Sequence, residues 1–511
     1  MLSLERSMII AIVGAILLEC NAASLPMQAT GESNPKVKMY RENIVQAKTL
    51  ENLDVQLDHF VGVSEDNGTI LFMLSASDTE ALAAFQNAYE LDKDWRTIPA
   101  PLEYSFVMPG FIDAHVHAPQ FDNMGVGYDM ELLPWLKNYT LPLEEKFDMS
   151  GDGENGVPNE ITADFVLNSY RSVVEKILDQ GTTTASYYAT VDPHATLTLA
   201  KQVQDLGQRA YVGKVNSDIN MPAGLKETTA QSIASTKWFI EAVQDLDSPL
   251  ITPVISPRFA LGASFELMTQ LGDIARQYNL PVQTHLDENK HEVADVLAAY
   301  PFATSYTDVY AQAGLLNVSH IILGHCVHLT DAEIAQLGTY NTSVGCAHCP
   351  LSNYALNSGI APVRKYLGAD LRMGLGSDVA GGYSSDMLQV MRGAILASKS
   401  LYFAHDWDEE EWAPLEYYGV LNLATKGSAA IMGLGDQVGT LEPGYQWDAL
   451  HIDLRAKNSM TSLEYIPDAS EVGLSLTMDE LVSKFIYEGD SNNIVTVWVN
   501  GQVVKDKTES T

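Results

Sequence analysis

The sequence predicts an α/β protein, a (β/α)8 TIM-type barrel with a small β-sandwich domain formed from both chain ends. Three observations support this fold class. Between residues 106 and 434, short β-rich runs alternate with amphipathic helical patterns. Strand-like segments stand on both sides of that region. The length of 511 residues, 46% of them hydrophobic, is sufficient for a barrel and one further domain.

The first two dozen residues differ from the rest of the chain. The apolar run at residues 8–18 is too short to span a bilayer but suits the core of a signal peptide. Small residues that permit cleavage follow at Ala22 and Ala23. We therefore expect a signal peptide at residues 1–23 and a secreted protein. The alternative is a cytoplasmic protein with an N-terminal extension.

The regions that flank the barrel predict the β domain. Residues 57–63 and 69–74 are expected to be strands, and residues 78–89 a helix. Beyond residue 434 the helical pattern stops, and residues 439–454 and 493–505 again predict strands and turns. We expect residues 39–105 and 435–511 to combine into one composite β domain beside a barrel of residues 106–434.

Eight βα units in series are typical of a closed parallel barrel. The expected strands end at His117, Tyr188, Val215, Ser256, His285, His325, His348 and Asp378. Helical patterns between them cover residues 163–178, 199–206, 232–243, 264–278, 331–337 and 385–398.

Charge restricts the partners. The net charge of −36 argues against nucleic acid and against an anionic membrane surface, because both require clustered Lys and Arg. We expect no membrane insertion of the mature chain. The four cysteines include one in the predicted leader, and the remaining three do not indicate a disulfide framework. A small molecule is the expected partner.

Polar residues at the predicted strand ends indicate a metal site. His115 and His117 are two residues apart on a strand and therefore point to the same face. Carboxyl ends of barrel strands meet at one face, so His285, His325 and Asp378 are expected to join them. Imidazoles and a carboxylate suit one Zn²⁺ per subunit with an open position for water, although another divalent ion is chemically possible. A His-x-His pair by itself is as readily structural.

Glu288 follows His285 at the expected transition from strand to helix. A carboxyl group at that place can carry a proton between a metal-activated water and a substrate nitrogen. The alternative is a helix-starting Glu, whose charge is favourable near a helix N-terminus.

Longer motifs surround these residues, and they resemble a known family. The segments PGFIDAHVH, THLDEN, LGHC, GLGSDVAGG and LEPGYQWDALHID resemble the metal-dependent amidohydrolase superfamily. More specific segments, WLKNYTLP at residues 135–142, SPRFALGAS at 256–264 and HCPLSN at 348–353, resemble its guanine deaminase family. The resemblance extends from about Met108 to Val504.

The resemblance implies zinc-dependent hydrolytic deamination of guanine to xanthine and ammonia by a homodimer. It implies metal ligands at His115, His117, His285 and Asp378. It implies catalytic roles for Glu288, His325 and Asp378, and substrate contacts at Gln120, Arg258, Phe259, His285, Glu288 and Asp378. The chemistry is consistent, because an Arg can donate to the guanine carbonyl and a Phe offers the ring a flat apolar face.

Two alternatives stay open at this stage. The chain could deaminate another heterocycle, such as 8-oxoguanine or a triazine, or could be a catalytically silent scaffold relative. The sequence departs from the family pattern at Leu351, where Asn is usual, and at His328, which we interpret as structural or as a support for the site.

Overall fold

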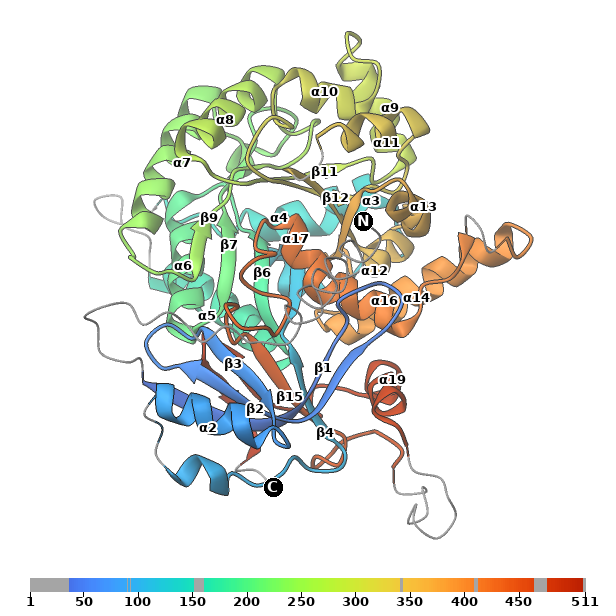
Figure 1. The fold of residues 1–511 in the computed structure, drawn as a ribbon. Coiled ribbons are helices and arrows are strands. Elements are labelled where there is room, and N and C mark those ends of the chain that lie inside the picture. The colour runs from blue at the N-terminus through green and yellow to red at the C-terminus, as the bar shows by residue number, and fades with distance from the viewer. Residues whose placement is uncertain are drawn as a thin grey trace, which may run out of the picture.

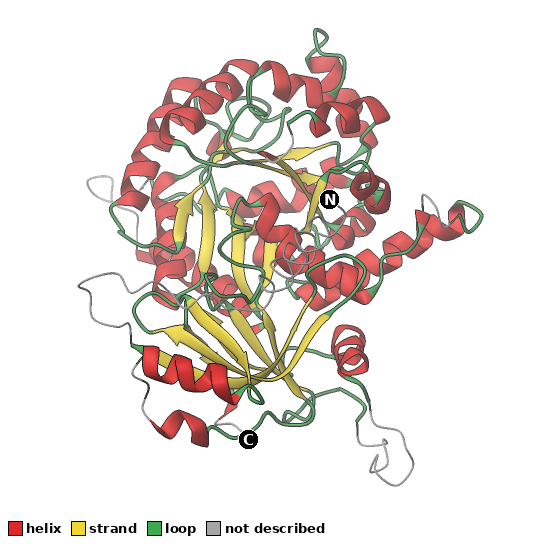
Figure 2. Cartoon of the chain, viewed as in Figure 1, coloured by secondary structure: helices red, strands yellow, loops and turns green. Residues whose placement is uncertain are grey.

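The computed structural model describes residues 36–89, 91, 93–150, 160–340, 343–408, 412–463 and 476–508. The predicted signal peptide at residues 1–23 lies outside this range. The described chain forms a ring of parallel strands surrounded by helices, with a second sheet below it (Figure 1). Helices cover the outside of the ring, and strands dominate the lower part (Figure 2).

The barrel strands follow one another in chain order. They are β5 (Phe111–His117), β6 (Thr182–Tyr188), β7 (Arg209–Gly213), β9 (Ile251–Pro253), β11 (Val282–Leu286), β12 (Ile321–His325), β13 (Val344–His348) and β14 (Arg372–Leu375). Two parallel sheets, β5-β6-β7-β9 and β11-β12-β13-β14, account for all eight. The eighth strand ends three residues before the predicted Asp378, which stands in the following loop.

Backbone hydrogen bonds beyond the strand ends join these two sheets at both seams. Asp378 N donates to His115 O over 2.8 Å, and His117 N donates to Val379 O over 2.9 Å. On the opposite side, Ile255 N donates to Pro281 O and Gln283 N donates to Ile255 O. A short ladder between β8 (Val215–Asn216) and β10 (Ser256–Pro257) lies above this second seam.

The predicted barrel helices are present, and most are longer than expected. They are α5 (Glu160–Asp179), α6 (Pro193–Leu206), α7 (Thr229–Gln244), α8 (Phe265–Tyr278), α11 (Asp331–Gly338) and α14 (Met387–Ala404). Additional helices are α9 (Lys290–Ala299), α10 (Tyr306–Gln312), α12 (Pro350–Ala355), α13 (Val363–Gly368), α16 (Tyr417–Asn422) and α17 (Ser428–Ile431), with the π-helical η7 (Leu423–Gly427) between the last two. No helix in the described part of the chain combines the length and the apolar character needed to cross a membrane.

Both chain ends contribute to one seven-stranded sheet. Its strands, in spatial order, are β17 (Gln502–Asp506), β16 (Ile494–Val499), β15 (Ala449–Asp453), β4 (Ser105–Pro109), β1 (Val37–Gln46), β2 (Asp54–Ser64) and β3 (Ile70–Ser75). Tyr40 on β1 lies 5.5 Å from Trp498 on β16, although three strand steps in a flat sheet span about 14 Å. The strands form one curved sheet, and side chains from β1 and β16 meet in one apolar core. The domain boundaries stay a prediction.

Two elements of this region differ from the sequence prediction. Residues 37–46 form β1, whereas the first strand expected from the sequence begins at residue 57. The helix α19 (Met478–Glu488) follows residue 434, where the helical pattern was expected to stop. A Thr477–Glu480 capping box starts α19, and Phe485 packs on Phe111 at the barrel base. The smaller helices α2 (Thr79–Ala88) and η1 (Lys93–Thr97) cover the outer edge of the sheet.

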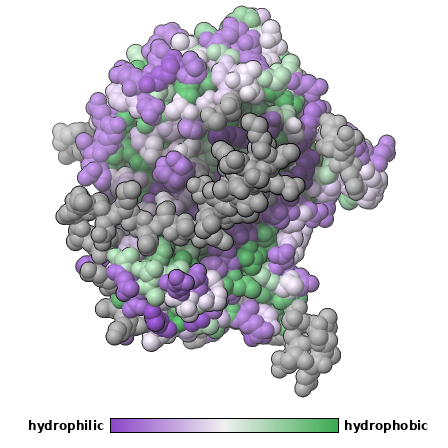
Figure 3. Space-filling model, in the orientation of Figure 1, coloured by the Kyte–Doolittle hydropathy of each residue, from purple (hydrophilic) through white to green (hydrophobic). Residues whose placement is uncertain are grey.

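A buried ion pair connects the barrel to the sheet. Arg209 on β7 donates from Nε and Nη2 to the two carboxylate oxygens of Asp448, over 2.9 and 3.1 Å. Both side chains are buried. Elsewhere, the face shown in Figure 3 is largely hydrophilic over the outer barrel helices, as the net charge of −36 leads one to expect.

Candidate active site

The four predicted metal ligands come together at the carboxyl ends of the barrel strands. His115 Nε2 lies 3.3 Å from His117 Nε2 and 3.3 Å from Asp378 Oδ1. His117 Nε2 lies 3.1 Å from His285 Nε2 and 3.4 Å from Asp378 Oδ1. An ion that is tetrahedrally bound at 2.0–2.1 Å places its ligand atoms about 3.3 Å apart. These spacings therefore fit one shared cation.

His325 is the fifth member of this cluster. Ligand atoms of His115, His285, His325 and Asp378 all lie within 4.8 Å of one another. His325 Nε2 is 3.7 Å from Asp378 Oδ2 and 3.5 Å from Glu288 Oε2. It therefore lies between the predicted metal ligands and the predicted proton carrier.

Hydrogen bonds on the far side of the rings set the orientation of two imidazoles. His285 Nδ1 is 2.6 Å from the backbone oxygen of Arg258, which can only accept, so this nitrogen carries the proton. His325 Nδ1 is 3.0 Å from Asn353 Oδ1. Both histidines thus direct an unprotonated Nε2 into the cluster, the form that binds a metal.

Burial determines the charge states in the cluster. Burial lowers the pKa of His115, and together with the neighbouring imidazoles it lowers the pKa of His117 and His285 well below the usual range. Burial opposes ionisation of Asp378, but the interactions with His325 and His115 outweigh it and lower its pKa to about 2. Neutral imidazoles and an ionised carboxylate are the ligand forms that a divalent cation requires.

Glu288 has the opposite character. Burial, and then the nearby charge of Asp378, raise the pKa of Glu288 well above its usual range. This shift favours the protonated carboxyl group, and in that form Glu288 can act as an acid. Glu292 fixes the turn that presents it, because Glu292 Oε2 accepts from the backbone nitrogens of Glu288 and Asn289.

The strand ends turn sharply at this face. Asp287, His325 and Asp378 all have positive φ values, of 50°, 69° and 48°, which non-glycine residues seldom adopt. Such strained conformations are concentrated at functional sites. Gly324 allows a close approach beneath the cluster, because a Cβ atom there would lie 2.6 Å from Cε1 of His115.

A narrow cavity, partly open to solvent, lies over the cluster. It is lined by His117, Gln120, Leu132, Trp135, Leu136, Arg258, Phe259, His285, Glu288, Glu292, His325, Leu356 and Asp378. All predicted substrate contacts are among these residues. A flat, mostly apolar ligand with a few polar atoms matches such a lining.

Several of these lining residues are absent from the sequence prediction. Leu132 and Trp135 belong to α3 (Leu132–Trp135), and Leu136 starts the π-helical η3 (Leu136–Thr140) that leads into α4 (Leu141–Glu144). This segment, which we name the cover segment (residues 132–144), lies across the cavity. The apolar WL pair was visible in the sequence, but only the three-dimensional arrangement shows which way it faces.

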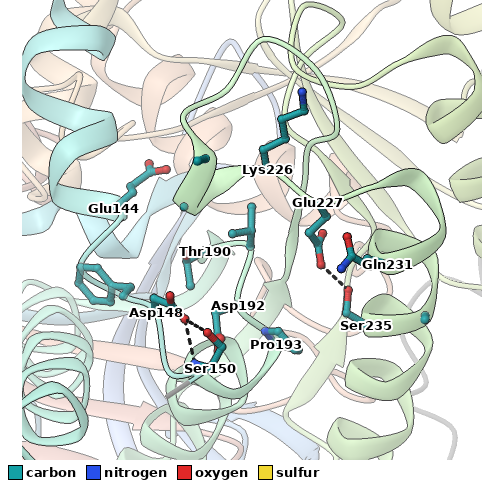
Figure 4. A pocket seen from close by; sticks show the side chains of 15 residues that line it. Glu144, Asp148, Ser150, Thr190, Asp192, Pro193, Lys226, Glu227, Gln231 and Ser235 are labelled. Atoms are coloured by element: carbon teal, nitrogen blue, oxygen red, sulfur yellow. Dashed lines mark hydrogen bonds between the residues drawn. The ribbon is translucent and has the colours of Figure 1, made fainter. Parts of the chain in front are cut away.

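A second, more open hollow lies beside the barrel (Figure 4). Its lining includes Glu144, Asp148, Asp192 and Glu227, and it contains none of the predicted site residues. We therefore place the chemistry in the narrower cavity.

The two departures from the family pattern lie away from the cavity. Leu351 is buried and lies beside Gly393 of α14, where a Cβ atom would come within 2.6 Å of Leu351 Cδ2. His328 Nε2 is 2.7 Å from the backbone oxygen of Ser358. Neither residue lines the cavity.

Comparisons with known proteins identify the family and the fold. The model of the amidohydrolase family matches residues 106–504. A guanine deaminase of Dictyostelium discoideum is 35% identical over 486 residues, which cover 93% of this chain and 99% of that protein. The crystal structure of a guanine deaminase from C. acetobutylicum with bound guanine has a TM-score of 0.77 at 31% identity, covering 92% of this chain and 100% of that one. An adenosine deaminase from Xanthomonas campestris with bound Zn has a TM-score of 0.71 at 25% identity, covering 92% and 93%.

Proposed function

The chain belongs to the amidohydrolase family and, within it, to the guanine deaminases, and from this premise we propose that it hydrolyses guanine to xanthine and ammonia. The observation that carries the proposal is the position of the cavity. Arg258, Gln120 and Phe259 line the same narrow space as the histidine cluster and Glu288. A ring held by the first group therefore lies over the second.

The same residues suit a purine with a carbonyl group. Arg258 is a donor and offers no acceptor, so it pairs with the oxygen of guanine and leaves the amino group of adenine without a partner. Sites built to hydrogen-bond one polar group reject the mismatched analogue strongly. Phe259 supplies an apolar face for the ring.

We assign the metal to His115, His117, His285 and Asp378, and zinc suits three imidazoles and a carboxylate. When bound, the ion supplies the positive charge that lets a water molecule lose a proton near neutral pH. Oδ2 of Asp378 lies 3.7 Å from Nε2 of His325, so Asp378 would accept this proton while His325 would orient the water.

Glu288 completes the proton transfers. In its protonated form it gives a proton to a ring nitrogen of guanine, while the oxygen of water forms a bond to C2. The resulting carboxylate takes the second proton of the water, now on the hydroxyl group at C2, and delivers it to the departing amine. The first proton, held by Asp378, then returns Glu288 to its acid form. The carbon–nitrogen bond then breaks, and xanthine and ammonia leave.

A substrate panel tests this function. We expect the purified chain to release xanthine and ammonia from guanine, and to act far more slowly on adenine, 8-oxoguanine or a triazine. Faster turnover of one of the latter compounds would assign the chain to another branch of the family. Absence of ammonia from every compound, with metal bound, would support a silent scaffold.

Two further proposals concern the assembly and the compartment of the chain. Homodimer formation follows from the resemblance, and light scattering of the purified chain tests it. Secretion follows from the leader at residues 1–23, and the N-terminal sequence of the mature protein, together with its compartment, tests it.

A further inference from the structure

One buried carboxylate holds both polar residues that we assign to the purine. Glu144 ends α4 in the cover segment, and its side chain is only 2% exposed. Its Oε1 accepts from Nε2 of Gln120 over 2.8 Å, and its Oε2 accepts from Nη1 of Arg258 over 2.5 Å. The residue also forms part of the wall of the neighbouring hollow (Figure 4), so it lies in the partition between the two spaces.

This arrangement decides which donors remain for a ligand. Of the five N–H groups of Arg258, one is bound to Glu144, and the others have no hydrogen-bond partner among the described residues. Gln120 gives one N–H to Glu144, and its oxygen accepts from Ala380 N over 3.3 Å. The amide is therefore fixed with its remaining N–H available. Both side chains line the cavity.

Glu144 also balances the charge of Arg258. Arg258 is 4% exposed, and a buried guanidinium without a counter-charge attracts anions strongly. Paired with Glu144, it presents hydrogen-bond donors at a nearly neutral site. Such a site suits a neutral lactam oxygen better than an anionic ring.

From these contacts we infer that Glu144 is a positioning and specificity-determining residue: it aims Arg258 and Gln120 at the purine and sets the preference of the cavity for neutral over anionic rings. This inference rests on the proposed function for the identity of the ligand. It also gives the cover segment a role, because Trp135 and Leu136 line the cavity from the same segment that carries Glu144.

The test compares two competitors that share the purine carbonyl but differ in charge. Hypoxanthine is neutral near pH 7, and urate is an anion. The dissociation constant of each is measured by calorimetry, alongside kcat/KM for guanine. For Glu144→Gln we expect kcat/KM to fall about 10- to 100-fold, the effect of losing a charge-assisted hydrogen bond. We expect the affinity ratio of urate to hypoxanthine to rise about tenfold or more, because Arg258 is left without its counter-charge.

Further variants test the direction in which the affinity ratio of urate to hypoxanthine changes. Arg258→Gln leaves Glu144 as an unpaired anion, so the ratio should move the other way, and the double variant should return it towards the wild-type value. If either Glu144→Gln or Arg258→Gln does not fold, the remaining single variant and the double variant still show in which direction the affinity ratio changes. Glu145→Gln is the matched control: it makes the same change one residue later, at an exposed side chain, and should leave both readings unchanged.

The outcomes separate the alternatives. If Glu144→Gln weakens both competitors equally, Glu144 is merely structural and the inference is wrong. An unchanged kcat/KM for guanine would refute the positioning role. If the wild-type chain binds both purines but does not deaminate guanine, the proposed function fails, while the shift in the competitor ratio still decides the role of Glu144.

Discussion

Gly324→Ala tests whether close packing beneath His115 holds the metal site together. Gly324 belongs to β12, and a Cβ atom added there would lie 2.6 Å from Cε1 and 2.9 Å from Nδ1 of His115. An ordinary carbon–carbon contact is about 3.5 Å, so the ring or the strand must move by about 1 Å. Metal ligands tolerate displacements of about 0.2 Å. We therefore expect metal affinity to fall about 10- to 100-fold, the range seen when support for a ligand is lost.

The assay measures the metal dissociation constant by competition with a chromophoric chelator, together with thermal unfolding of the metal-free protein. Overpacking alone destabilises a core by about 1–3 kcal/mol, and the metal-free measurement separates that cost from the effect on binding. Gly338→Ala is the matched control, because a Cβ atom there would meet nothing within 4 Å. If Gly324→Ala bound the metal with wild-type affinity, the reasoning would be refuted. The metal site would then not depend on the close packing between Gly324 and His115.

The remaining predictions concern proton transfer, domain attachment and pH. Glu288→Gln should retain metal but lower kcat for guanine about 10²- to 10⁴-fold, measured by steady-state kinetics, because the amide cannot carry the proton; a normal kcat would assign that role elsewhere. Arg209→Met should lower the free energy of unfolding in urea by about 3–5 kcal/mol by leaving Asp448 buried without its partner. Arg171→Met, at an exposed pair, should cost less than about 1 kcal/mol, and equal losses in the two variants would contradict this account. Burial raises the pKa of Glu42 to about 7, so ionising it in the folded chain costs stability. That cost is absent below pH ~4, grows between pH ~4 and ~7, and is complete above pH ~7. Glu42→Gln should therefore raise the free energy of unfolding by about 1–3 kcal/mol at pH 8 and leave it unchanged at pH 4. An increase in stability that is the same at both pH values would contradict this account.

Local patterns in the sequence predict most of the barrel and of the metal cluster. His117, His285 and His325 each stand at or next to the end of a short apolar run, and parallel strands bring such ends to one face. The sequence predicts less accurately where Asp378 lies. The eighth strand ends at Leu375, and a turn in which Asp378 has a positive φ brings its side chain to the cluster. A sequence pattern of period two contains no information about that turn.

The role of Glu144 could not be predicted, for a physical reason. Its partner Arg258 is 114 residues away in the chain, and Glu144 and Glu145 are equivalent in local sequence. The π-helical turn η3 lies just before these two residues and changes the direction in which the residues after it face. Such turns are frequent at functional sites. Which of the two carboxylates faces inward depends on that turn and on packing. The same limit applies to α19, where Phe485 packs on Phe111, a residue more than 300 positions earlier in the chain.

Guanine turnover before and after removal of bound metal tests the central claim most directly. The purified chain is stripped with a chelator, its metal content is counted, and xanthine formation is followed as zinc is returned. We predict that activity disappears with the metal and is restored as about one equivalent of zinc per chain is added back. Full turnover of guanine by metal-free protein would contradict the claim that His115, His117, His285 and Asp378 hold the ion on which the chemistry depends.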